Sequence, residues 1–182
     1  DLGREAVGRR RSGRARGARG LLAIAVGHRE GAPDLKVRMV VAERLEGAAL
    51  VPMLSDPDYS VRLIAARRVP LDVLPVAMND PDPQVRREVA RRIKPDVLPT
   101  MAFDVDPLVR RAVATRLEPA QLAALVGDED LRVRYIVAER GSPQALVQLL
   151  DDPDPEVRRV ARERGQSIDV CILRTGKDEP AT

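Results

Sequence analysis

Cysteine, histidine and aromatic residues are almost absent from this sequence. Its 182 residues include one cysteine, one histidine and no tryptophan, and aromatic residues make up only 2%. A single cysteine excludes an internal disulfide, which fits a reducing compartment, and we expect a cytoplasmic protein. Compact globules usually fill their irregular interiors with aromatic side chains. Their scarcity favours a stack of thin layers built from small and medium-sized aliphatic residues.

Long hydrophobic runs are also missing. No apolar run approaches the roughly 18 residues that a membrane span needs, so we expect no membrane association. The net charge of +3 is unevenly spread, because residues 1–30 contain eight arginines and three acidic residues. The remaining residues contain 23 basic and 25 acidic side chains. The basic character therefore belongs to the N-terminal segment.

The dipeptide Val-Arg recurs six times at a constant spacing of 24 residues. Its valines are Val37, Val61, Val85, Val109, Val133 and Val157. An aspartate stands three residues before each valine, and an arginine stands seven after it. A leucine stands thirteen after each of the first five valines, and Val170 replaces it in the sixth copy. Six copies in one register indicate a structural repeat.

Each repeat predicts two short helices. The aspartate suits a helix N-cap, and Pro83, Pro107 and Pro155 follow it at the first helical position. The first α-helix should end near the second arginine, since proline or glycine follows in most copies. The second element contains prolines in several copies, which favours a helix of one or two turns with 3₁₀ geometry.

The apolar residues of the first helix cover more than half of its circumference, so one repeat needs neighbours on several sides. The arginine directly after each valine points into this apolar sector, four residues after the capping aspartate. We expect these arginines to lie partly buried beside those aspartates and to tie one repeat to the next. The predicted ladder comprises Arg38, Arg62, Arg86, Arg110, Arg134, Arg158, Asp34, Asp58, Asp82, Asp106, Asp130 and Asp154.

The pattern in residues 56–66 resembles HEAT repeats, but those use longer units. The 24-residue period and stretches such as 59–74 are more similar to the leucine-rich repeat variant family. This resemblance covers residues 34–177 and implies an all-α, right-handed superhelical solenoid of alternating α- and 3₁₀-helices without β-sheet. We expect an Arg/Gly-rich segment over 1–33 that includes a degenerate capping repeat, six repeats over 34–177 and a polar tail over 178–182.

The same resemblance implies an iron–sulfur protein with a small N-terminal [4Fe–4S] segment, and a link to nitrogen fixation. Such a cluster ordinarily takes four thiolates, and this chain has only Cys171. The cluster segment is therefore expected upstream of Asp1, is missing, or marks a limit of the resemblance. Cys171 occupies a repeat position held elsewhere by Val51 or Ala123, which favours a buried structural residue over a cluster ligand or reactive thiol.

No catalytic pattern is present, and we expect a protein that is not an enzyme. His28 has no suitably spaced partners for zinc binding or catalysis. The N-terminal segment could neutralise phosphates, which makes nucleic acid a possible partner. It lacks aromatic residues for base stacking, and an irregular, solvated cap is the favoured alternative. The arginines of this segment are Arg9, Arg10, Arg11, Arg14, Arg16 and Arg19.

A second row of arginines stands at the end of each first helix, at Arg44, Arg68, Arg92, Arg116, Arg140 and Arg164. Structural pairing is the favoured role, and a groove for an anionic partner is the alternative. The preferred function is a non-enzymatic scaffold that binds a protein partner on its repeat surface. An iron–sulfur redox or regulatory protein and a nucleic-acid-binding protein are the alternatives.

Overall fold

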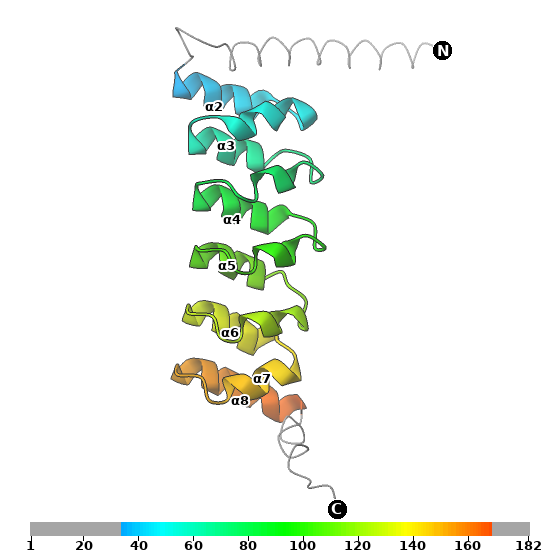
Figure 1. Ribbon diagram of the computed structural model, residues 1–182, viewed down its shortest axis with the longest axis vertical. Coiled ribbons are helices and arrows are strands. Elements are labelled where there is room, and N and C mark those ends of the chain that lie inside the picture. Colours follow the sequence, from blue (N-terminus) through cyan, green and yellow to red (C-terminus); the bar gives the residue numbers. More distant parts are fainter. Residues whose placement is uncertain (1–33, 169–182) are drawn as a thin grey trace, which may run out of the picture. The chain divides into compact units, whose positions relative to one another are not determined.

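The computed structural model describes residues 34–168, and these divide between two compact units that meet in sequence at Arg92 and Ile93 (Figure 1). Within the described range the chain contains α-helices and 3₁₀-helices and no strand. The prediction of an all-α fold with alternating α- and 3₁₀-helices is confirmed. The arginine-rich segment, His28, Cys171 and the second half of the sixth repeat lie outside the described residues.

The first unit contains a regular alternation of the two helix types. Its elements are α2 (Leu35–Arg44), the 3₁₀-helix η1 (Gly47–Ser55), α3 (Tyr59–Ala66), η2 (Leu74–Ala77) and α4 (Pro83–Arg92). Helix α3 packs against α2, α4 and η1. Helix α3 therefore has the several neighbours that its wide apolar surface requires.

The second unit continues the alternation and then departs from it. Its elements are η3 (Leu98–Met101), α5 (Pro107–Ala114), η4 (Gln121–Leu125), α6 (Leu131–Arg140), α7 (Pro143–Leu149) and α8 (Pro155–Ile168). The second element of the α6 repeat is an α-helix, α7, where 3₁₀ geometry was expected. Ser142 caps α7 by accepting a hydrogen bond from the Ala145 amide, and Pro143 occupies the first position. No proline interrupts the rest of α7, so α-helical hydrogen bonding can proceed.

The helix starts follow the predicted capping chemistry. Asp58, Asp106 and Asp130 accept hydrogen bonds from first-turn amides of α3, α5 and α6. Asp82 and Asp154 do the same for α4 and α8. Asp34 makes no side-chain cap, although its carbonyl accepts the first hydrogen bonds of α2. Prolines begin α4, α5 and α8, where no amide donor is needed.

The core consists of the same few positions in successive layers. The repeat valine, the alanine five residues later and the leucine thirteen residues later are at most 1% exposed, except Val37, which is 43% exposed. The leucines are Leu50, Leu74, Leu98, Leu122 and Leu146. Small aliphatic side chains therefore fill thin layers, as the scarcity of aromatic residues predicted.

Gly141 is expected to tolerate no side chain. It ends α6, and a Cβ atom there would lie 2.5 Å from the Val137 carbonyl oxygen and 3.2 Å from the Ala145 Cβ. We expect Gly141→Ala to lower the free energy of unfolding by about 1–3 kcal/mol, because backbone and neighbouring helix must move apart. Chemical denaturation followed by circular dichroism measures the change.

Gly127→Ala is the matched control, because a Cβ at Gly127 has no atom within 4 Å. It should change the free energy of unfolding by no more than about 0.5 kcal/mol. Equal losses in the two variants would show that backbone flexibility, and not the close approach at Gly141, governs the effect.

Candidate partner-binding surface

In four of the described repeats, an arginine reaches into the next repeat. Arg62 donates from Nε to Asp80 Oδ2 at 2.7 Å and from Nη2 to Asp80 Oδ1 at 3.0 Å. The two residues stand 18 positions apart and belong to consecutive repeats. The other pairs of this kind within the two units are Arg38–Asp56, Arg110–Asp128 and Arg134–Asp152. These bidentate contacts hold neighbouring repeats together.

The predicted acid partners of these arginines are wrong. The carboxylate that pairs with Arg62 belongs to Asp80, the first aspartate of the next Asp-Pro-Asp loop, and not to the capping residue Asp58. The Asp58 carboxylate accepts the Ser60 amide at the start of its own helix. The cap thus uses the second aspartate of each loop, and the first remains for the arginine. The 24-residue recurrence of Asp56, Asp80 and later copies was the signal that could have identified them.

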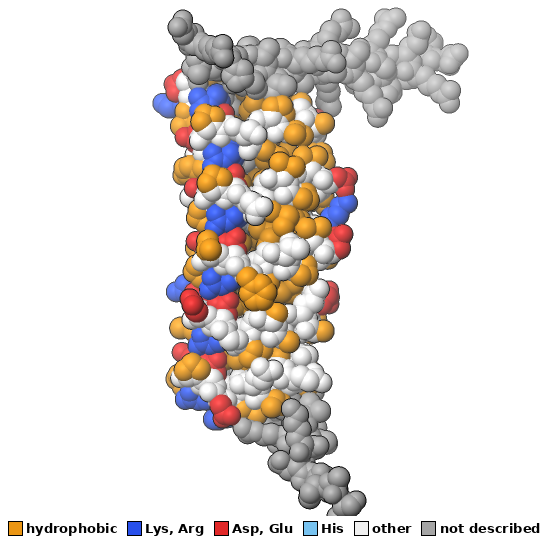
Figure 2. Space-filling view, viewed as in Figure 1, with side chains coloured by type: hydrophobic (Ala, Val, Ile, Leu, Met, Phe, Trp, Pro, Cys, Tyr) orange, Lys and Arg blue, Asp and Glu red, His pale blue; other side chains and the backbone are white. Residues whose placement is uncertain are grey.

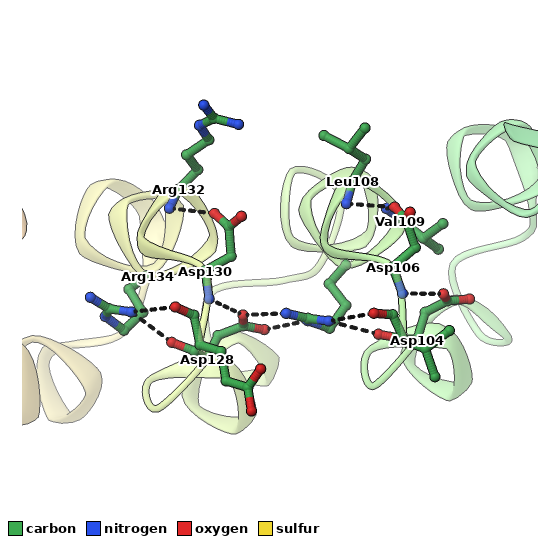
Figure 3. Close-up of polar contacts among 11 residues, drawn as sticks. Asp104, Asp106, Leu108, Val109, Asp128, Asp130, Arg132 and Arg134 are labelled. Carbon is green, nitrogen blue, oxygen red and sulfur yellow. Dashed lines mark hydrogen bonds and ion pairs between the residues drawn. The ribbon is translucent and has the colours of Figure 1, made fainter. Parts of the chain in front are cut away.

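The same residues also fix the loop that precedes each helix. Arg134 donates from Nη1 to the carbonyl oxygens of Asp128 and Glu129, which lie in the loop before its own helix α6. The Asp128 carboxylate, in turn, accepts the amide of Asp130. Figure 3 shows these contacts, with the corresponding aspartates Asp104 and Asp106 one repeat earlier. Each arginine therefore links its own loop to the next one.

Burial strengthens these contacts. The side chains of Arg62 and Asp80 are 10% and 4% exposed. The hydrogen bond to Asp80 raises the pKa of Arg62, and burial opposes this shift without reversing it. The pKa values of Arg110 and Arg134 are raised for the same reasons, by Asp128 and Asp152. A raised pKa favours the charged guanidinium, so this stabilisation is lost only as the pH rises through the raised arginine pKa, and below that it is present wherever the partner carboxylate is ionised.

The second row of arginines caps helices instead of pairing with acids. Arg140 donates to the carbonyl oxygens of Ala114 and Leu117 at 2.7 and 3.0 Å, at the end of α5. Arg68, Arg92 and Arg164 reach carbonyl oxygens at or just after the end of the preceding helix in the same way, and Arg116 donates to the carbonyl oxygen of Ile93. A cation at a helix C-terminus meets both free carbonyls and the negative end of the helix dipole. Stacking thus explains these arginines.

One set of exposed positions is not explained by stacking. In the second element of each repeat, the residues 15 and 18 positions after the repeat valine are exposed, and we call these residues the variable surface. They are Pro52, Ser55, Val76 and Asn79 in the first unit, and Thr100, Phe103, Ala124, Gly127, Gln148 and Asp151 in the second. Nine of these ten are uncharged. Figure 2 shows the basic and acidic side chains of each unit beside a largely hydrophobic or uncharged surface.

The second unit contains an open groove next to this surface. Its volume is about 400 Å³, and Phe103, Val105, Arg110, Asp128 and Glu129 are among its lining residues. Phe103 and Val105 are 74% and 88% exposed. Sequence reasoning did not identify this groove, because its residues come from two successive loops and from η4 and α5.

Other sites expected from the sequence receive no support from the described residues. Residues 34–168 contain no group of three or more His, Cys, Asp or Glu side chains placed to hold a metal ion. The chain's single cysteine does not supply the four thiolates of a [4Fe–4S] cluster, so this chain does not fit that cofactor by itself. Among the helices of the described part, none is long and apolar enough to cross a membrane. Binding of nucleic acid by the N-terminal arginines stays a prediction, as does the cytoplasmic location.

The stacked helix pairs and their arginine contacts define a helical repeat protein. Residues 131–154, one full repeat, match the model of the family described as leucine rich repeat variant. A solved structure described as a leucine-rich repeat variant with a novel repetitive structural motif is 39% identical, with a TM-score of 0.73. The similarity covers 81% of this chain and 60% of that one. No curated protein matches the sequence.

Proposed function

We propose that this protein is a non-enzymatic repeat scaffold that binds a protein partner on its variable surface. The observation that carries the proposal is the contrast between that surface and the rest of each repeat. Core positions and the helix arginines that pair with the next repeat recur with nearly constant chemistry, because they serve stacking. The exposed side chains of the variable surface differ in every repeat.

The chemistry of the variable surface supports a protein partner. Val76 is 72% exposed and Phe103 is 74% exposed, and exposed apolar side chains of this size commonly mark interaction sites. The surface carries a single charged residue, Asp151, within the described repeats. A polyanion would require basic side chains there, whereas a protein partner can bury uncharged surface favourably.

Site-specific photocrosslinking in cells tests this function. A photoreactive amino acid would replace Val76 in one variant and Thr100 in another, both on the variable surface. We expect a partner to crosslink from each position, and we expect mass spectrometry to identify it. Glu139, exposed on α6, is the control position and should give no crosslink to that partner.

Crosslinks at Glu139 but at neither Val76 nor Thr100 would contradict the proposal, because the binding surface would then lie on the α-helices. The absence of crosslinks at all three positions would contradict partner binding itself. Each variant changes one exposed side chain, so the layers beneath should remain folded.

A further inference from the structure

The groove of the second unit lies between two successive repeats. Phe103 and Val105 come from the loop that leads into α5, and Asp128 and Glu129 come from the corresponding loop before α6. Arg110 lies between the loops, where its Nε donates to Asp128 Oδ2 at 2.8 Å. The first loop thus supplies the exposed apolar side chains of the groove, and the second loop supplies the carboxylate of Glu129.

Three residues of this groove differ in chemical type from the residues at the equivalent positions of the other described repeats. Val105 and Glu129 stand at the loop position that is proline in the other described Asp-Pro-Asp loops, namely Pro57, Pro81 and Pro153. Phe103 is the only phenylalanine of the chain, and the equivalent residues are Ser55, Asn79, Gly127 and Asp151. Stacking requires none of these departures, because the other repeats pack without them. Their convergence on one groove indicates a local function.

The exposed chemistry of the groove favours one kind of ligand. Phe103 and Val105 present apolar surface that a ligand could remove from water. Glu129 is exposed, whereas the carboxylates of Asp104 and Asp128 in the same lining accept hydrogen bonds within the protein. Arg110 is the one basic residue of the lining, and its guanidinium is bound to Asp128. An anionic ligand would therefore meet repulsion, and a cationic one would meet attraction.

We propose that this groove binds a short segment of a partner protein in which an apolar side chain lies next to lysine or arginine. The apolar side chain packs against Phe103 and Val105, and the basic side chain pairs with Glu129 of the second loop. The volume of about 400 Å³ accommodates a few side chains and not a folded domain. This inference rests on the proposed scaffold function and specifies its partner.

A variant that restores the repeat pattern tests the groove without disturbing the fold. It combines Phe103→Asn, Val105→Pro and Glu129→Pro, each taken from an equivalent position of this chain. The probe is a displayed library of short random peptides, selected on the complete, unaltered protein. Enriched peptides would then be synthesised, and fluorescence anisotropy would measure their dissociation constants. The control variant is Leu71→Ser, which changes an exposed apolar residue of the other unit that lies outside the variable surface.

We expect the enriched peptides to combine an apolar residue with lysine or arginine. Their affinity should fall by about tenfold or more in the triple variant and stay unchanged in Leu71→Ser. Enrichment of acidic peptides, equal binding to the triple variant, or no enrichment would each overturn the groove proposal. None of these results would by itself overturn the scaffold function, because crosslinking at Val76 and Thr100 tests that separately. Circular dichroism would verify that the triple variant is folded.

Discussion

Replacing Asp80 with alanine is expected to lower the free energy of unfolding by about 3–5 kcal/mol. The substitution leaves the guanidinium of Arg62 buried without its carboxylate, and the charged group then lacks the compensation for its lost hydration. It also removes the acceptor of the Asp82 amide, which lies 2.9 Å from Asp80 Oδ1. Both losses occur at the junction of two repeats. Chemical denaturation and hydrogen exchange at the Asp82 amide measure them.

Two further variants separate the contributions. Asp80→Asn keeps an oxygen for the Asp82 amide but removes the charge, so its effect should be smaller than that of Asp80→Ala. The double variant Arg62→Met, Asp80→Ala should lose less stability than the sum of the two single variants, because no unpaired charge remains. Glu156→Gln, which alters an exposed ion pair with Arg159, should leave stability unchanged. Equal effects for Asp80→Ala and Glu156→Gln would show that burial of the loop pair contributes nothing.

Truncation of a core leucine should have an effect of similar size. Leu122 is fully buried in the second unit, and Leu122→Ala is expected to lower the free energy of unfolding by about 2–5 kcal/mol. The layers are thin, and the neighbouring side chains are already packed against their own repeats. They can therefore close the resulting cavity only in part.

Leu131→Ala provides the comparison for Leu122→Ala within the same unit. Leu131 is 49% exposed at the start of α6, so the loss there should stay within about 0.5 kcal/mol. Thermal and chemical denaturation of both variants would measure the difference. Equal losses of unfolding free energy in the two variants would mean that the number of leucines, and not the burial of Leu122, determines the stability of the protein.

The sequence predicted the features that depend on neighbouring residues. The 24-residue register, the helix starts at Asp58 and its equivalents, and the short second helices all follow from spacing, capping and proline placement. The buried positions followed as well, because one helix with so wide an apolar surface has to stack. These features need only local geometry, which repeats along the chain.

Contacts between repeats were harder to predict. The guanidinium of Arg62 could reach Asp58, four residues earlier, or Asp80, 18 residues later. The shorter sequence distance favoured Asp58. Helix capping determines the partner: the Asp58 carboxylate accepts the Ser60 amide, and Arg62 pairs with Asp80. The groove at Phe103 was missed for a related reason: Val105 and Glu129 look unremarkable until the fold places their loops side by side.

The arginine–aspartate contacts also constrain how such a chain can change in length. The two residues of each pair stand 18 positions apart, and the arginine binds the loop of the following repeat through its aspartate. Insertion or deletion of one residue within that interval shifts the aspartate away from its arginine and misaligns the layers. Duplication or loss of a complete 24-residue unit leaves each pair intact. Growth by whole modules is therefore the route that this architecture permits, and the number of variable-surface positions changes with it one repeat at a time.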